Sequence, residues 1–234
     1  MLLLAYHVFI LSLYIYSIWF DSNFVHMPFP SKEFENLPLR ARPIFLTFWT
    51  VVIQTLYFSV AILNDVFGTN AATKRPPLIR KIKDHVYSLA FTTALYVVTI
   101  FWTLYNYDKT FIYPDEETEK HIPTWLNHVM HTLIFPIILL ELLISYRNYP
   151  KRKTGLTIAL CSAAAYSAYI HYLYFIYGIW PYNFLHIFSW TSKIVMTLFS
   201  AVLGVMYYLL GEKLDSLMSK STKAHKHANG LKSH

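Results

Sequence analysis

Charged residues are scarce in this chain. Asp, Glu, Lys and Arg make up 14% of its 234 residues, whereas hydrophobic residues make up 55%. A soluble domain has about 25% charged residues, and a water-soluble globule of this composition would expose too much hydrocarbon. The composition therefore excludes an ordinary soluble domain.

Cysteine and the familiar catalytic motifs are also missing or nearly so. The one cysteine, Cys161, lies in an apolar run, so the sequence has no internal disulfide and no zinc–cysteine framework. The sequence contains no G-x-S-x-G, P-loop, G-x-G-x-x-G or H-E-x-x-H motif. A serine elbow, a nucleotide-binding loop and a zinc-protease helix are therefore excluded.

The hydrophobic residues that are present fall into six long runs. Each run has the length that a helix needs to cross a hydrocarbon core of about 30 Å. We predict one all-α, polytopic membrane domain, residues 1–212, with six spans at about 2–20, 43–67, 84–106, 122–146, 155–177 and 187–210. The first run lacks a basic n-region and a cleavage site, so we expect a retained span rather than a signal peptide. The basic segment 213–234 is expected to be a frayed helix followed by a flexible cytosolic tail.

Lys and Arg are concentrated on one side of these spans. The loops after the second and fourth spans and the C-terminal segment carry most of them. Because basic loops stay in the cytosol, both termini are predicted to be cytosolic, and the acidic patch at 115–119 is predicted to face the lumen or the exterior. The net charge of +7 is dispersed over short loops, which argues against a nucleic acid partner.

The fourth predicted span carries an unusual polar face. Asn127, His128 and His131, together with Thr124, share about a quarter of the helix circumference at 100° per residue. An ionisable residue at mid-bilayer costs about 2.5–3.5 kcal/mol, so each one needs a reason. Pro136 is expected to kink this helix and to free the carbonyl of Thr132.

Other predicted spans place polar groups at a similar depth, which suggests a cavity in the lumenal half of the bundle. Each group also has a simpler interpretation. The Thr47 hydroxyl could bond back to the carbonyl of Pro43, and Lys193 could snorkel to the surface. Acidic residues near the cytosolic side are interpreted as locks between helices, formed with Arg or Lys. The polar groups considered are Thr47, Gln54 and Asp65 on the second span, Asp84 on the third, Glu141 on the fourth, His171 on the fifth and Lys193 on the sixth.

A threonine hydroxyl beside an imidazole can carry out acyl transfer. The hydroxyl is a weak nucleophile until a neighbouring base takes its proton, and histidine can take that proton and return it to the leaving alcohol. Helix rise does not choose between His128 and His131 as the partner of Thr47. His128 and His131 could also hold a metal, or His131 and His171 a haem, but both signals are weak, so we predict no metal and no cofactor.

The fourth span and several loops resemble the signature of a known family. The segments are Ile122-Pro-Thr-Trp-Leu-Asn-His-Val-Met-His-Thr-Leu-Ile-Phe-Pro136, Ile112-Tyr-Pro114, Tyr149-Pro150, Lys153-Thr-Gly-Leu-Thr157 and Tyr208-Leu-Leu-Gly-Glu-Lys-Leu214. In residues and spacing they are similar to the androgen-induced protein family of multi-pass membrane hydrolases. The family cleaves fatty acid esters of hydroxy fatty acids with a threonine and a histidine. The resemblance implies His131 for the histidine and Thr47 for the threonine.

The resulting hypothesis is an intramembrane lipid hydrolase. Thr47 attacks the ester, His131 is the base and then the acid, and Asn127 or His128 orients the histidine or the oxyanion. Lys193 is a candidate to hold a substrate carboxylate. The alternatives are a non-enzymatic transporter or receptor with a polar cavity, or a haem or metal protein. The expected surroundings are the bilayer of the endoplasmic reticulum or the plasma membrane, and the oligomeric state stays open.

Overall fold

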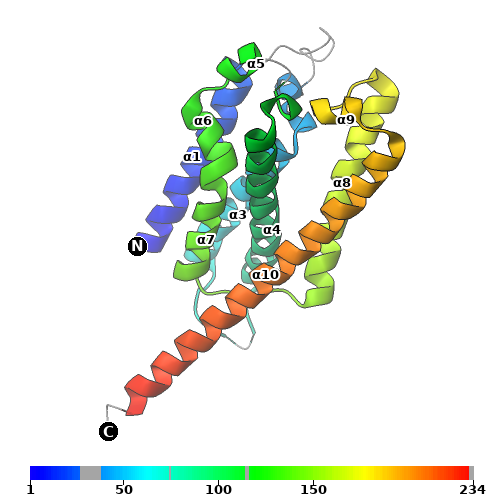
Figure 1. Ribbon diagram of the computed structural model, residues 1–234. Helices are drawn as coiled ribbons and strands as arrows, with labels where there is room; N and C mark the ends of the chain where they lie inside the picture. Colours follow the sequence, from blue (N-terminus) through cyan, green and yellow to red (C-terminus); the bar gives the residue numbers. More distant parts are fainter. Residues whose placement is uncertain (27–37, 74, 114–115, 232–234) are drawn as a thin grey trace.

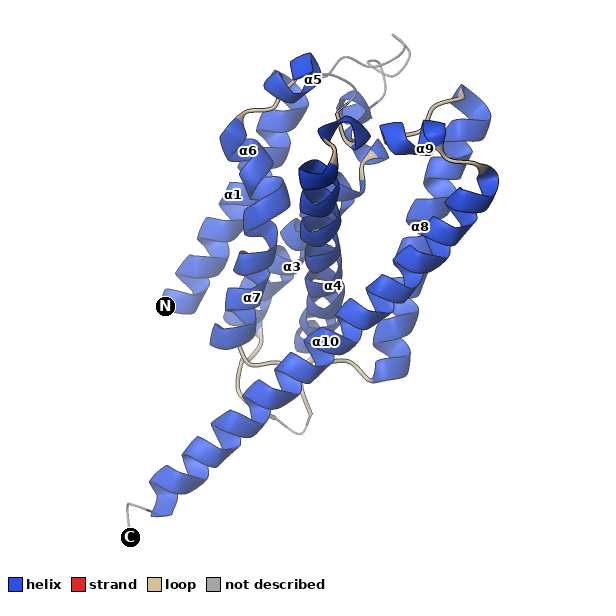
Figure 2. Cartoon of the chain, viewed as in Figure 1, coloured by secondary structure: helices blue, strands red, loops and turns tan. Residues whose placement is uncertain are grey.

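The computed structural model describes residues 1–26, 38–73, 75–113 and 116–231, and within these ranges every regular element is helical (Figure 2). Six segments are long and apolar enough to cross a membrane, which confirms the predicted all-α fold with six spans. They are α1 (Leu2–Phe24), α3 (Leu46–Phe67), α4 (Leu78–Tyr107), the segment Thr124–Ile144, α8 (Arg152–Tyr177) and α10 (Trp190–Leu231). Four short helices lie in the loops: η1 (Pro38–Ile44), η2 (Lys109–Phe111), α5 (Glu116–Lys120) and α9 (Asn183–Ile187).

Several boundaries differ from the predicted spans for local reasons. The second span begins at Leu46 rather than 43, because Pro43 belongs to η1. The third begins at Leu78, directly after Pro77, since Arg80 and Lys83 find partners inside the bundle. α10 continues into the predicted tail as far as Leu231. The segment 27–37 of the first loop, and Asp115 of the acidic patch, lie outside the described residues. The cytosolic orientation of the termini stays a prediction.

The helices form a main group and a hairpin beside it. Figure 1 shows α1, α3, α4 and the fourth span side by side, with α8 and α10 beyond α4 and α10 crossing it obliquely. In the main group α3 packs against α1 and α4, and in the hairpin α10 packs against α8 and α4. The largest buried hydrophobic cluster of the described residues lies in the main group and is rich in aromatic rings, among them Tyr14, Tyr57, Phe58, Tyr87 and Phe91.

Two glycines allow close packing of the hairpin near the N-terminal end of α8. At Gly155 of α8, the Tyr208 ring of α10 fills the space that a β-carbon would need. One turn further along α10, Gly211 lies against the Phe91 ring of α4 in the same way. The absent side chains allow both close approaches, and bulkier residues would force the helices apart.

The fourth span is not one continuous α-helix. It consists of α6 (Thr124–His128), a π-helical turn η3 (Val129–Leu133) and α7 (Ile134–Ile144). Pro136 has no N–H to donate, and in a π-helical register the orphaned acceptor is the carbonyl of His131, five residues earlier. That carbonyl accepts a hydrogen bond from the indole Nε1 of Trp102 at 2.8 Å. The sequence predicted a break here but placed the free carbonyl at Thr132.

Away from the π-helical turn, the main group contains a buried ionic cluster. His7 of α1 contacts Asp65 of α3 through Nδ1 (2.6 Å) and Glu141 of α7 through Nε2 (3.0 Å). Tyr57 donates to the second oxygen of Glu141 at 2.6 Å. Asp65 and Glu141 therefore do connect helices, but their bridging partner is an imidazole rather than the expected Arg or Lys.

The third acidic residue, Asp84, has a more local role. It pairs with Arg80 on its own helix at 2.8 Å and accepts the backbone N–H of Asn148 at 3.1 Å. The interaction joins α4 to the loop after α7, and not to another spanning helix. The expected lock between spans is therefore wrong for Asp84.

Candidate active site

Thr47 and His131 contact each other. Thr47 is the second residue of α3, and its Oγ1 lies 3.2 Å from Nε2 of His131 in the π-helical turn. The two residues are 84 positions apart in the sequence, and their spans bring them to the same depth. The geometry allows the hydroxyl to donate its proton to the imidazole.

The Thr47 hydroxyl does not bond back to its own helix. The carbonyl of Pro43, four residues earlier, accepts the indole N–H of Trp49 at 2.7 Å. Other threonines of α3 do bond back, as Thr50 and Thr55 donate to carbonyls one turn before them at 3.0 and 2.8 Å. Because Trp49 occupies the carbonyl that Thr47 would use, the Thr47 hydroxyl can turn towards His131.

Asn127 determines which nitrogen of His131 is basic. Nδ1 of His131 lies 2.6 Å from the Asn127 side-chain oxygen and 3.1 Å from the Asn127 backbone carbonyl. Both oxygens are acceptors, so Nδ1 carries the proton and Nε2 has the free lone pair. That lone pair faces Thr47.

The surroundings of His131 hold the ring in one plane. The Phe101 ring of α4 stacks on the imidazole with centroids 3.6 Å apart and an interplanar angle of 10°. His131 is 8% exposed. The stack from one side, the Asn127 bonds and the Trp102 bond to the backbone leave the imidazole little freedom to rotate.

Both residues open onto a large apolar cavity. Its volume is about 1070 Å³, and Thr47, His131 and Phe101 all belong to its lining. The walls come mainly from α3, α4, α8, α9 and α10, with smaller contributions from α1, η1, η2 and η3, and most of the exposed lining atoms are carbon. This volume is slightly above the range that small-molecule pockets in proteins enclose, about 300–1,000 Å³.

His128 lies outside this cavity. It is exposed, its Nδ1 contacts the Thr132 hydroxyl at 3.0 Å, and its ring stacks on Trp102 with centroids 5.9 Å apart. Of the two histidines that helix rise could not separate, His131 is the one placed beside Thr47.

Lys193 also lies apart from the cavity lining. Its Nζ donates to the carbonyl of Phe188 at 2.6 Å and sits 5.1 Å from the ring centroids of both Trp180 and Trp190. The ammonium is thus engaged by an aromatic cluster at the start of α10. The structure does not bring it to Thr47, and we do not propose it as a carboxylate holder.

The polar stripe predicted on the second span is divided among three places. Thr47 faces the cavity, Gln54 donates to the carbonyl of Ala90 between α3 and α4 at 3.1 Å, and Asp65 belongs to the ionic cluster. No continuous polar path along α3 joins these three described residues.

A family model described as FAR-17a/AIG1-like protein matches residues 2–216. The chain belongs to the FAR-17a/AIG1-like family. The Homo sapiens protein named androgen-dependent TFPI-regulating protein is 34% identical over 211 residues, which is 90% of either chain. The Homo sapiens androgen-induced gene 1 protein is 32% identical over 188 residues, or 77% of this chain and 79% of its own. No solved structure matches.

In this FAR-17a/AIG1-like protein, two tyrosines that the sequence did not single out hold the start of α3. Leu46 N–H donates to the Tyr182 hydroxyl at 3.0 Å, and Tyr166 OH donates to the carbonyl of Ile44 at 2.9 Å. The two hydroxyls are 3.1 Å apart. Burial raises the pKa of the Tyr182 phenol, so it stays protonated. Together they fix the backbone on the N-terminal side of Thr47.

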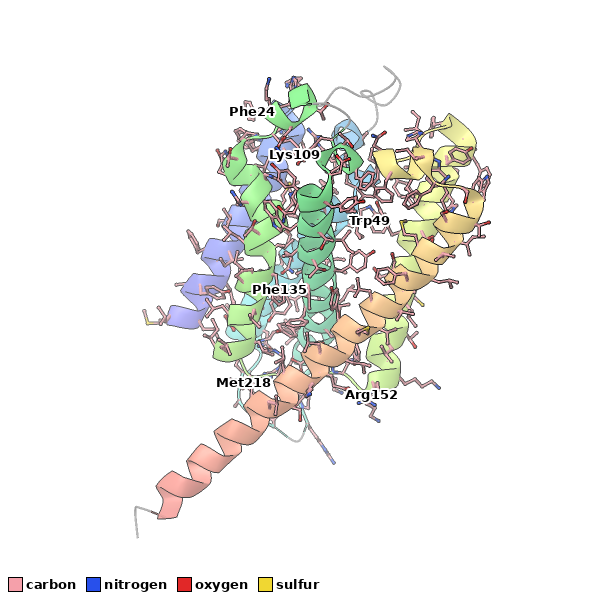
Figure 3. The ribbon with its side chains drawn as sticks, in the orientation of Figure 1. Phe24, Trp49, Lys109, Phe135, Arg152 and Met218 are labelled. Carbon is pink, nitrogen blue, oxygen red and sulfur yellow. The ribbon has the colours of Figure 1, made fainter. Side chains whose placement is uncertain are left out.

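Trp49, Phe101 and the Asp21–Arg42 ion pair were also missed. Trp49 of α3 lies on the side of the main group that faces the hairpin (Figure 3). Its ring is edge-on to that of Tyr166 of α8, with centroids 5.6 Å apart. Asp21 and Arg42 form an ion pair of 3.0 Å and both line the cavity. Aromatic residues fill every span of this FAR-17a/AIG1-like chain, so no pattern in the sequence distinguishes Trp49 or Phe101. Only the opposite charges near the first loop could have suggested the ion pair.

Proposed function

We propose that this protein is an intramembrane hydrolase of lipid esters, with Thr47 as nucleophile and His131 as general base. One observation carries the proposal. Asn127 Oδ1 contacts Nδ1 of His131 at 2.6 Å, and Nε2 of His131 contacts the Thr47 hydroxyl at 3.2 Å. Thr47 lines an apolar cavity. An orienting acceptor, a base and a nucleophile in this sequence form the general arrangement of an activated hydroxyl.

The reaction would proceed in two halves. Thr47 Oγ1 attacks the ester carbonyl carbon while Nε2 of His131 takes the hydroxyl proton, and the tetrahedral intermediate collapses as His131 returns that proton to the departing alcohol oxygen. Water then attacks the acyl-threonine ester, giving its proton to Nε2. The intermediate collapses again, the acid leaves, and Thr47 recovers its proton from His131.

The position of Thr47 on α3 would favour the attack. It lies in the first turn of a 22-residue helix, where the aligned peptide dipoles place a partial positive charge. Negative charge that develops on the ester oxygen near this turn is stabilised by that field, and the effect is stronger where water is excluded.

The substrate class follows from the cavity and from the family resemblance. An apolar chamber of this volume suits long hydrocarbon chains rather than a polar metabolite. The resemblance of the fourth span implies fatty acid esters of hydroxy fatty acids, which would be cleaved to a fatty acid and a hydroxy fatty acid.

The test is ester hydrolysis by purified protein in lipid nanodiscs. We expect Thr47→Ala and His131→Ala each to lower kcat by about 10³-fold or more, because the hydroxyl and its base act as a unit. Thr47→Ser should retain activity, since it keeps the hydroxyl.

Two matched controls lie close to the pair. Thr55→Ala removes a hydroxyl of α3 that bonds only to its own helix, and His128→Ala removes the neighbouring histidine outside the cavity. Both variants should hydrolyse the ester at the wild-type rate. Full turnover by both Thr47→Ala and His131→Ala would refute the mechanism.

A further inference from the structure

The cavity extends well beyond Thr47 and His131, into a region we call the inner lobe. The inner lobe lies between α4 and the hairpin of α8 and α10. It is lined by residues between Leu89 and Ile100 on α4, between Ala159 and Ala168 on α8, and between Met196 and Gly204 on α10.

The inner lobe is long enough for an extended hydrocarbon chain. Phe101, which stacks on His131, and Leu89, the lining residue of α4 farthest from it, are 12 positions apart. At about 1.5 Å per residue this separation is about 18 Å along the helix. The lobe therefore runs from the reactive pair through much of the hydrocarbon core.

Several hydroxyl groups on its walls are already engaged in hydrogen bonds between the described residues. Thr92, Thr93 and Thr197 donate to carbonyls four residues earlier at 2.8, 3.0 and 2.9 Å. Tyr96 of α4 donates to Ser200 of α10 at 2.8 Å, which ties the two walls together. These side chains offer the lobe their methyl groups and ring carbons, which suits an apolar ligand.

The far end of the lobe is closed by close helix packing. Its last lining positions on α8 and α10 are Ala159 and Gly204. One turn beyond them, Gly155 and Tyr208 are in contact and seal the hairpin. A β-carbon on Gly204 would meet nothing within 4 Å, so this glycine borders open space rather than a packed neighbour.

We propose that the inner lobe binds a long unbranched acyl chain of the ester, and that Gly204 and Ala159 set the longest chain accepted. The identification of the ligand as the acyl chain of an ester rests on the proposed hydrolase activity. The binding of a long hydrocarbon chain in the inner lobe does not depend on that activity. Bulk at either position would shorten the lobe from its closed end and leave Thr47 and His131 about three turns away.

The first experiment compares chain lengths. Esters with one common alcohol and acyl chains from short to long are hydrolysed by the wild type, Gly204→Phe and Ala159→Phe. The ratio of long-chain to short-chain kcat/KM should fall about tenfold or more in both variants, because a long chain loses methylene contacts in the shortened lobe and a short chain does not. Val202→Phe is the matched control, because Val202 is on the lipid-facing side of the same helix, 58% exposed and outside the lining. An unchanged ratio in both lobe variants overturns the proposal.

The second experiment measures binding without catalysis. Thr47→Ala protein is irradiated with a long-chain fatty acid that carries a diazirine at its methyl end, and the labelled peptides are identified. We expect labelling around Leu89, Ala159 and Gly204 that Gly204→Phe abolishes and Val202→Phe does not. If no ester is cleaved but this labelling holds, the lobe stands and the hydrolase proposal falls. Labelling confined to lipid-facing positions overturns the lobe.

Discussion

A single carbonyl decides what the Thr47 hydroxyl can do. Trp49 occupies the Pro43 oxygen at 2.7 Å, and a helical threonine in lipid otherwise satisfies its hydroxyl on such an oxygen. From the sequence alone, a bond back to the Pro43 carbonyl was the simpler interpretation of the Thr47 hydroxyl. The competing donor sits two residues further on, and its effect could not be predicted because it depends on the direction in which an indole N–H points.

The first residue-scale prediction removes that donor. Trp49→Phe keeps an aromatic ring against Tyr166 but frees the Pro43 carbonyl, so the Thr47 hydroxyl should bond back and leave His131. We expect the rate of Thr47 acylation by an ester-type probe to fall about 10-fold or more, in line with the loss of a positioned base. Trp19→Phe, on the exposed face of α1, is the control. An unaltered acylation rate in Trp49→Phe would show that the indole bond does not position the hydroxyl.

The second prediction at this scale concerns Asn127. Asn127→Leu removes the side-chain acceptor of the Nδ1 proton and leaves only the backbone carbonyl at 3.1 Å. The other tautomer then becomes accessible, and kcat should fall about 10- to 100-fold, as for loss of an orienting partner. Asn127→Asp retains an acceptor oxygen and should lose much less. Equal rates in the two variants would mean that the side chain does not orient the ring.

At the scale of elements, the π-helical turn sets the direction of His131. Hydropathy predicted the span, and Pro136 predicted a break, but the wide turn depends on Trp102 reaching over from α4 to satisfy the carbonyl that is left free. A tertiary contact of this kind leaves no periodic signal in the sequence.

Pro136→Ala tests this element. Alanine restores an N–H and a strong helix preference, so the turn should relax towards an α-helix and rotate the His131 side chain away from Thr47. We expect esterase activity to fall about tenfold or more, with helix content by circular dichroism unchanged. Pro123→Ala, just before α6, is a control that keeps the turn. Wild-type activity in Pro136→Ala would contradict a role for the wide turn.

At the scale of the whole molecule, the ionic cluster ties the first helix to the rest. Both ring nitrogens of His7 contact carboxylates, and His7 and Glu141 are fully buried. Removing one partner from a buried ionic group leaves uncompensated charge, at a cost of about 3–5 kcal/mol. The sequence pattern identified the acidic residues, but not His7, which lies near the start of an apolar run with no visible partner.

We therefore expect His7→Gln to lower the free energy of unfolding by about 3–5 kcal/mol, measured as a lower thermal midpoint in detergent. His7→Gln combined with Glu141→Gln should recover part of the loss, because the orphaned charge is gone. Phe9→Leu, at an exposed position of the same helix, should change little. A midpoint that does not move in His7→Gln would show that the cluster does not hold α1.

The sequence predicts features that depend on local interactions better than features that depend on tertiary contacts. The six spans depend on local hydropathy, so their number was correct. Most of their ends were off by a few residues, but the third helix begins six residues before the predicted start and α10 continues 21 residues beyond its predicted end. The pairing of Thr47 with His131 came from a family resemblance, and depth alone left His128 open. The oblique crossing of α10, and the lobe that it encloses, arise from two close approaches at Gly155 and Gly211, and neither glycine shows its contact in the sequence.

The lone thiol of the chain has a practical value. Cys161 is exposed on α8, between Leu160 and Ser162, which both line the inner lobe. A nitroxide or a small chromophore can therefore be attached there without removing any other cysteine. Its mobility or emission in the intact protein would report, in real time, how the hairpin wall responds as the chamber beside it fills and empties.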